Sequence, residues 1–322
     1  METTKKPSPI AKHFQLQQLK DGIYAAISID GTGSMSNAGI IDLGDCILIF
    51  DTFFTPQAAE DLRLAAEQLL DKPVRYVINS HMHEDHVHGN QVFSKEADII
   101  ATSRTRELIG TRVVENLAEN KSDIAGGQAV LKSLEEQIVQ EQNVEKRKQL
   151  ELSLATNREY LSAVPTMEIV LPNLTFEQKL VLYGSRRTIE LLTYGGGHTD
   201  SDAFLYLPGE RLAFMGDLLF VKNHPWMGDG HPEEWLPILD RVKELAIDIF
   251  VPGHGPVGTR EDISLLQQYI TTIVQLSKEL HEADKPLEEA KKTAMPAPFD
   301  TWGSCEVFSW NMEFLYDRLS RS

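Results

Sequence analysis

Cysteine is scarce in this chain of 322 residues, which contains only Cys46 and Cys305. The two thiols lie far apart in the sequence, and neither has another cysteine close to it. This excludes a disulfide framework and a metal site built from clustered thiolates. We expect two ordinary thiols, with Cys46 in a buried strand.

The chain also lacks long apolar runs and an excess of positive charge. No uninterrupted apolar stretch has the length that a membrane span requires, and the polar N-terminus METTKKPSPIAKHFQLQQL has no apolar signal-peptide core. These features favour a cytoplasmic protein with no membrane partner. The formal net charge of −17 at pH 7 repels polyphosphate, so nucleic acid is not an expected partner.

Hydrophobic residues make up 42% of the chain, enough for one large core or two smaller ones. After a polar lead of about twenty residues, β patterns alternate with helical patterns, which predicts an α/β layered fold. The expected early elements are a strand over 22–29, a hairpin over 39–51, a helix from Pro56 to about Leu70, and strands over 74–79 and 97–101. Later strands are expected over 174–183, 188–194, 203–207, 211–214 and 247–251.

Two regions read as helices added to this core. From about 102 to 162, Glu, Gln, Lys and Leu dominate, which predicts a helical insertion. Its role as a lid over a site, a homodimer contact or a solvated hairpin is left open by the sequence. At the C-terminal end, helices are expected near 259–281, 284–293 and 307–319.

Four short stretches carry ligand-type residues, and each follows a predicted strand or hairpin. They are His81-Met82-His83-Glu84-Asp85-His86, Gly195-Gly196-Gly197-His198-Thr199, Phe214-Met215-Gly216-Asp217 and Pro252-Gly253-His254-Gly255. Strand ends and loops are where side chains from different strands converge. The pattern therefore indicates one site assembled from four segments.

The donor types suit two divalent cations. Three imidazoles, from His81, His83 and His198, form a neutral ligand set that suits Zn²⁺ and leaves a position open for water. A second set comprises Asp85, His86 and His254, and Asp217 is left as a bridging carboxylate between two ions. Zn²⁺ is the expected metal, although Fe and Mn accept overlapping nitrogen and oxygen donors.

In this order, the motifs His-x-His-x-Asp-His, Gly-His-Thr, Gly-Asp and Pro-Gly-His-Gly resemble the metallo-β-lactamase-fold hydrolase superfamily. The resemblance extends from about residue 20 to 265. It implies a four-layer αββα sandwich of two mixed sheets. The chain would then be a single domain over 1–322, with the insertion at about 102–162 and extra helices at about 284–319. It also implies that Asp51 steadies the ligand loop.

Positions at which this chain differs from individual branches of the superfamily reduce the number of expected reactions. β-Lactamase branches hold Cys or Ser where this chain has Asp217, so a β-lactamase-like activity is only a minor alternative. The carboxylate resembles the glyoxalase II, lactonase and general hydrolase branches, although lactonases carry a tyrosine at the position of Phe220. The prediction is a binuclear hydrolase that cleaves a small ester, thioester or lactone, with Asp85 and Asp217 as its catalytic carboxylates.

Phe220, His224 and Trp226 are the candidate pocket residues for this small-molecule substrate. A mononuclear iron oxidoreductase resembling persulfide dioxygenases is the alternative function, because that branch shares the fold and much of the ligand set.

Overall fold

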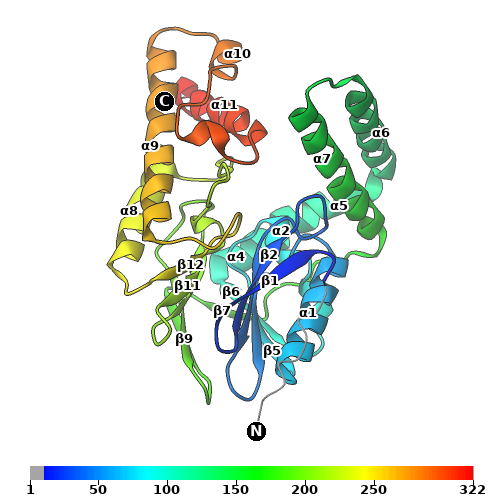
Figure 1. Ribbon diagram of the computed structural model, residues 1–322, viewed down its shortest axis with the longest axis vertical. Coiled ribbons are helices and arrows are strands. Elements are labelled where there is room, and N and C mark those ends of the chain that lie inside the picture. The colour runs from blue at the N-terminus through cyan, green and yellow to red at the C-terminus, as the bar shows by residue number, and fades with distance from the viewer. Residues whose placement is uncertain (1–10, 322) are drawn as a thin grey trace. The chain divides into compact units, whose positions relative to one another are not determined.

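The computed structural model describes residues 11–321, which divide into two compact units (Figure 1). The first unit runs to Glu177 and adds Val181–Thr188. The second contains Gln178–Leu180 and the chain from Ile189 onward. Residues 1–10 of the predicted polar lead lie outside the described range.

A mixed sheet of seven strands forms the centre of the first unit. In sheet order, the strands are β1 (Phe14–Lys20), β2 (Ile23–Ser28), β3 (Ala38–Asp42), β4 (Ile47–Phe50), β5 (Val74–Ile78), β6 (Asp98–Thr102) and β7 (Leu174–Phe176). β1 to β4 pair antiparallel, whereas β4 to β7 pair parallel. Parallel neighbours open their loops at the same edge, so the segments that follow β4 and β5 emerge side by side.

Helix α1 (Pro56–Leu70) connects β4 to β5, and its ends match its sequence signals. The hydroxyl of Thr55 accepts the backbone N–H of Ala58, and Pro56 occupies the first turn, where no N–H partner is needed. Asp71 ends the helix in a left-handed conformation. The buried face, which includes Leu62, packs in the same core as Ile49 and Val77 of the sheet.

Helices occupy most of the chain between β5 and β7, on both sides of β6. They are α2 (Glu84–Val87) and α3 (Asn90–Phe93) before β6, and α4 (Ser103–Leu108), a π-helical turn (Ile109–Val113), α5 (Val114–Ser122), α6 (Ile124–Gln140) and α7 (Val144–Ala163) after it. α6 and α7 pack against each other as a hairpin (Figure 1). α6 buries no residue, and in α7 only Leu154 and Ala163 are buried. The role of this hairpin stays a prediction.

The second unit contains most of a mixed sheet of five strands, although the last residues of β8 are grouped with the first unit. In sheet order, they are β12 (Ile249–Val251), β11 (Leu212–Phe214), β10 (Ala203–Leu207), β9 (Thr188–Thr193) and β8 (Lys179–Tyr183). Its helices are α8 (Pro232–Glu244), α9 (Arg260–Glu282), α10 (Leu287–Ala290) and α11 (Glu306–Arg321). The core contains Trp235 of α8 and Tyr269 of α9, both fully buried.

Three local predictions were wrong. The polar lead contains strand β1, whose alternating exposure marks it as an edge strand with one buried end at Phe14. The strand expected over 174–183 breaks at Glu177 into β7 and β8, which belong to different sheets. The helix expected over 284–293 is only the short α10 (Leu287–Ala290), which begins directly after Pro286.

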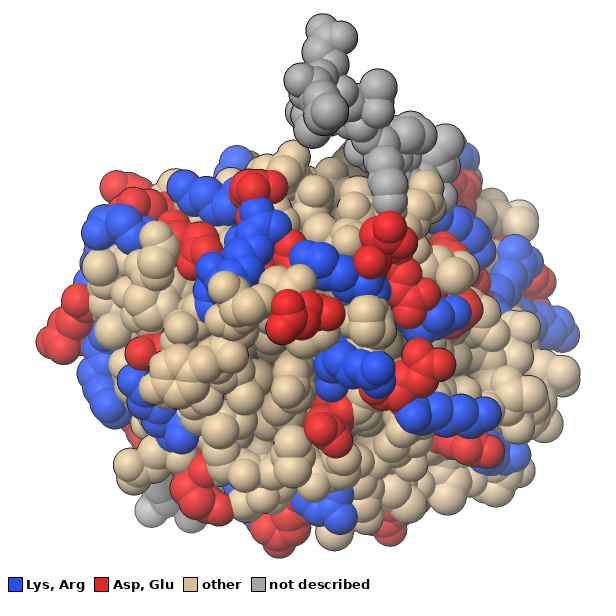
Figure 2. Space-filling view, turned by 90° about the horizontal axis from the view of Figure 1, so that it is seen from below, with Lys and Arg blue, Asp and Glu red and all other residues tan. Residues whose placement is uncertain are grey.

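Neither cysteine lies in a strand, and charged side chains of both signs share the surface (Figure 2). Cys46 and Cys305 are not joined in a disulfide, and Cys46 is half-buried beside the start of β4 rather than inside it, where it was expected. Acidic and basic side chains are interspersed on the face shown in Figure 2. No helix within residues 11–321 combines the length and apolarity that crossing a bilayer would need.

The core position of α1 can be tested with two leucines of the same helix. Leu62 is fully buried, whereas Leu64 is 50% exposed. We expect Leu62→Ala to lower the free energy of unfolding by about 2–5 kcal/mol, because it removes buried methyl groups and leaves a cavity. The control Leu64→Ala should change it by less than about 0.5 kcal/mol. Urea denaturation followed by circular dichroism measures both values, and equal losses would contradict the assigned packing.

Candidate metal centre

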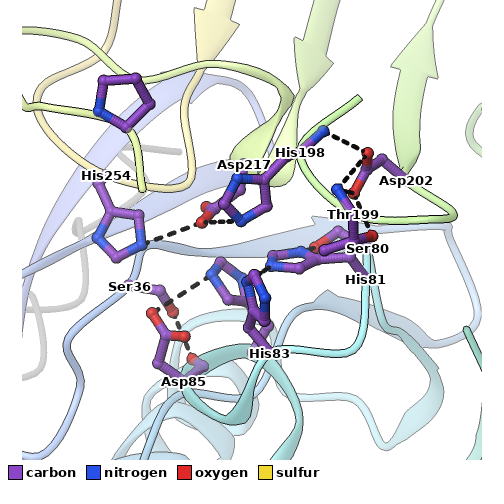
Figure 3. Close-up of polar contacts among 12 residues, drawn as sticks. Ser36, Ser80, His81, His83, Asp85, His198, Thr199, Asp202, Asp217 and His254 are labelled. Carbon is purple, nitrogen blue, oxygen red and sulfur yellow. Dashed lines mark hydrogen bonds and ion pairs between the residues drawn. The ribbon is translucent and has the colours of Figure 1, made fainter. Parts of the chain in front are cut away.

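The first histidine motif lies in the loop that leaves β5 in the first unit. Ser80 and His81 are buried at the end of this strand, and His83 is the residue that precedes helix α2. Nε2 of His81 lies 2.9 Å from Nδ1 of His83 (Figure 3). The two imidazoles predicted as neighbours in one ligand set are therefore adjacent within this unit.

Asp85 and His86 lie in α2, so the turn of this short helix places them beyond His83. Nε2 of His86 lies 3.4 Å from Oδ2 of Asp85. His86 is fully buried, whereas the Asp85 carboxylate is 14% exposed. The predicted pair is thus close together, with Asp85 on the accessible side.

Asp51 connects the two parts of this loop. Its carboxylate accepts the backbone N–H and the hydroxyl of Ser80, both at 2.8 Å, and its Oδ2 lies 2.8 Å from Nδ1 of His86. Burial raises the pKa of Asp51, and the charge of His86 and the hydrogen bonds from Ser80 oppose that rise. Its φ of 60° is unusual for a residue with a side chain, which is typical of strain held at a functional position.

Two buried asparagines, Asn79 and Asn90, stabilise the loop that carries the first histidine motif. Asn79 and Asn90 exchange side-chain hydrogen bonds at 2.9 and 3.0 Å, and Asn79 also donates to the carbonyl of His86. The backbone N–H and hydroxyl of Thr52 donate to the same carbonyl. Gly89 is required here, because a Cβ would lie 2.0 Å from the Thr52 carbonyl oxygen. The loop is therefore held rigid by polar groups that are themselves paired.

His88 follows the ligand motif but does not face solvent. It is fully buried and stacks with Phe54 and Tyr160 at centroid distances of 5.6 and 6.0 Å. Burial lowers its pKa to about 4. Neutral His88 therefore packs as an aromatic side chain against helix α7.

In the second unit, His198 follows β9 in a loop organised by Asp202. The buried Asp202 carboxylate accepts the backbone N–H groups of Gly197, His198 and Thr199 at distances from 2.8 to 3.2 Å. It also accepts the Thr199 hydroxyl at 2.7 Å (Figure 3). Three successive N–H groups on one carboxylate form a tight turn that fixes the direction of His198.

Asp217 and His254 follow the neighbouring parallel strands β11 and β12. Oδ2 of Asp217 lies 3.1 Å from Nε2 of His198 and 3.4 Å from Nε2 of His254 (Figure 3). Gly253 makes this approach possible, because a Cβ at that position would lie 1.8 Å from Oδ1 of Asp217. The two predicted imidazole ligands of this unit therefore meet at the carboxylate of the third, Asp217.

These distances fit a metal-binding donor set. Two donors bound to one tetrahedral Zn²⁺ at about 2.0–2.1 Å lie about 3.3 Å apart. Within the units, the separations of candidate donor atoms are 2.9, 3.1, 3.4 and 3.4 Å. Imidazole nitrogen and carboxylate oxygen are also the donors that divalent transition metals accept. Each unit thus presents half of a ligand set with suitable spacing and chemistry.

The three predicted pocket residues have different surroundings. Phe220 is buried and stacks on His254, with ring centroids 5.1 Å apart and planes 6° from parallel. His224 is buried against Tyr269 and Trp302, and burial lowers its pKa to about 4. Trp226 is half-buried and covers Gly228. Phe220 therefore borders a candidate ligand, whereas the contacts of His224 are those of an aromatic core.

Ser80 and Asp202 also support the candidate ligands, and neither was predicted from the sequence. Ser80 orients the first motif, because its hydroxyl contacts Nδ1 of His81 at 2.9 Å as well as the Asp51 carboxylate. An acidic residue four positions after His198 was the available signal for Asp202, since short polar side chains commonly cap backbone N–H groups in such turns.

Comparison with known proteins gives a family for this arrangement. The family model described as the metallo-beta-lactamase superfamily matches residues 31–254, a range that contains all seven candidate ligands.

Curated relatives match parts of longer proteins. The α subunit of 2,4-dinitroanisole O-demethylase from Nocardioides sp. (strain JS1661) is 26% identical over 239 residues, which are 73% of this chain and 54% of that protein. The linear primary-alkylsulfatase of Pseudomonas sp. (strain ATCC 19151) is 22% identical over 70% of this chain and 42% of that protein. The alkyl/aryl-sulfatase BDS1 of Saccharomyces cerevisiae is 38% identical over 26% of this chain and 12% of that protein. The chain thus spans about half or less of the length of these relatives.

Solved structures show the same fold. A metallo-beta-lactamase from Pontibacter korlensis matches with a TM-score of 0.58 at 17% identity, over 80% of this chain and 99% of that one. A metallo-beta-lactamase from Hirschia baltica matches with a TM-score of 0.57 at 16% identity, over 81% and 98%. The predicted α/β class, with two mixed sheets and helices, is confirmed. Because the match covers more than half of the chain and includes all seven candidate ligands, the chain belongs to the metallo-beta-lactamase superfamily.

Proposed function

We propose that the two half-sites act together as one binuclear metal centre in a hydrolase. One ion would be held by His81, His83, His198 and Asp217, and the other by Asp85, His86 and His254. Asp217 would also serve the second ion, because its Oδ2 lies 3.4 Å from Nε2 of His254. The observation that carries this proposal is the convergence of His198 and His254 on one Asp217 oxygen. A single carboxylate between two imidazoles from different loops suits a bridge between two ions.

The metals supply two kinds of chemistry when bound: they make hydroxide available near neutral pH and they polarise the oxygen of an electrophile. The protein groups do the remainder. Asp85 is partly exposed and lies beside His86, so its carboxylate is the group placed to orient the attacking water and to take up its proton. Phe220 would form an apolar wall beside His254.

The proposed substrate is a small ester, thioester or lactone. The relatives extend this class, because two are named as sulfatases and one as an O-demethylase of an aromatic ether. All of these reactions release an alcohol, a phenol or a thiol from an acyl, sulfuryl or alkyl group. The substrate set therefore includes sulfate monoesters beside carboxylic esters.

Metal analysis combined with a substrate panel tests this proposal. The purified chain should contain two equivalents of zinc, iron or manganese by plasma mass spectrometry. It should also hydrolyse at least one of p-nitrophenyl acetate, p-nitrophenyl sulfate, decyl sulfate, a thioester and a lactone, and a chelator should abolish this turnover. One iron per chain with oxygen consumption would instead favour the dioxygenase-like alternative.

Asp217→Ala is expected to reduce turnover to background and to lower the metal content at the same time, because both ions lose a shared ligand. Asp300→Ala is the control, since Asp300 is an exposed acid of the same unit. Turnover and plasma mass spectrometry are measured on the same preparations. Full metal content with full activity in Asp217→Ala would remove this residue from the centre.

Asp51→Ala is expected to weaken metal affinity or turnover by about 10–100-fold, because His86 and Ser80 lose the carboxylate that orients them. The control Asp45→Ala removes an exposed acid from the turn between β3 and β4. Zinc titration with a competing chelator gives the affinity. An effect no larger than that of the control would show that the loop is held without Asp51.

Asp202→Ala is expected to weaken metal affinity or turnover by about 10–100-fold, because His198 would lose the support of its loop. Three backbone N–H groups would lose their acceptor, and the turn that directs His198 would loosen. Asp200→Ala in the same loop is the matched control, because its partly exposed carboxylate pairs with His231 instead. Equal zinc affinities of the two variants would contradict the role given to Asp202.

A further inference from the structure

A cavity of about 670 Å³ lies between helices α8, α9 and α11 of the second unit, and it contains none of the candidate metal ligands. Its apolar wall combines residues from all three helices: Leu236, Ile270, Val274, Leu315 and Leu319. Ile270 and Val274 are one turn apart on α9, as are Leu315 and Leu319 on α11, so each helix presents one face to the cavity. The volume falls within the range of about 300–1,000 Å³ that is typical of small-molecule sites.

Ser277 adds a polar group to this wall. Its side chain is fully buried, and its hydroxyl has no hydrogen-bond partner among residues 11–321. A helical serine ordinarily bonds to the carbonyl four residues earlier, and a buried hydroxyl without a partner costs free energy. A ligand that offers an oxygen to Ser277 would recover this cost.

One positive charge remains at the rim. The guanidinium of Arg318 is paired with Glu233 at 2.5 Å and donates to the Gly230 carbonyl. Lys278 is exposed, follows Ser277 directly, and makes no ion pair with any residue in the described range. In a chain with a net charge of −17, this apolar cavity therefore carries a locally positive edge.

We propose that this cavity binds a free amphiphile with an aliphatic chain and an anionic head group. The chain would lie along Leu236, Val274 and Leu315, and the head group would lie at Lys278 with one oxygen toward Ser277. A carboxylate is the simplest head group with this chemistry. The site goes beyond the proposed hydrolase and is independent of the metal ligands.

The distribution of apolar surface favours a small ligand over a protein partner. In the described parts of α8, α9 and α11, Trp310 is the single large hydrophobic residue that is mostly exposed, and it does not line the cavity. A protein interface would need an apolar patch that extends over the surrounding surface. Here the apolar side chains are gathered inside the cavity.

Fluorescence titration with 11-(dansylamino)undecanoic acid tests the proposal on the metal-loaded full chain. We expect saturable binding with a blue-shifted emission and displacement by dodecanoate. Val274→Trp fills the cavity and should weaken binding about tenfold or more. Lys278→Glu is a surface change that should weaken it by about threefold. The control Lys292→Glu, at an exposed lysine outside the cavity, should leave the affinity unchanged.

Asp217→Ala separates this site from the metal centre and should bind the probe as the unaltered chain does. Loss of binding in Asp217→Ala, with unchanged binding in Val274→Trp, would place the probe at the metal centre and overturn the inference. Absence of saturable binding, or binding only to phosphatidylglycerol vesicles, would also overturn it. So would a dimer in sedimentation that Val274→Trp and Lys278→Glu convert to a monomer, because the cavity would then be an interface between copies.

Discussion

The structure depends on holding imidazole and carboxylate donors still on loops, where the backbone has no ladder of hydrogen bonds to fix it. Both units solve this problem with a buried acid. Asp51 accepts from Ser80 and contacts His86, and Asp202 accepts three consecutive N–H groups around His198. A buried carboxylate is costly unless it is fully hydrogen-bonded, so each acid is stable only with its loop in the ligand-presenting form.

Backbone geometry contributes a second constraint at the same positions. Gly253 leaves the space that Asp217 occupies, and Gly89 lets the loop after β4 approach the segment that carries His86. Asp51 adopts a left-handed conformation directly after β4. Such features would be liabilities in an ordinary loop, and their concentration beside the candidate donors is what a preorganised metal site requires.

The helices outside the two sheets divide into two kinds. α6 and α7 form a hairpin that buries very little, whereas α8, α9 and α11 build a substantial core around Trp235 and Tyr269. The cavity among these last helices is therefore a gap in a well-packed region. Its apolar wall, the buried hydroxyl of Ser277 and Lys278, which is unpaired among residues 11–321, together suit a ligand with an aliphatic chain and an anionic head group.

The sequence by itself determined the fold class and the candidate donors, because strands show a period of two and ligand residues follow strand ends in a fixed order. His81, His83, Asp85 and His86 could be named since they share one short motif, and Asp217 and His254 since each follows a short apolar strand. The sequence did not reveal Asp202 as a support for His198, the stacking of His88 on Tyr160, or the division of 174–183 between two sheets. Only the tertiary structure decided these points, because burial and hydrogen-bond partners depend on which distant segments pack together. Local sequence patterns do not specify this long-range packing.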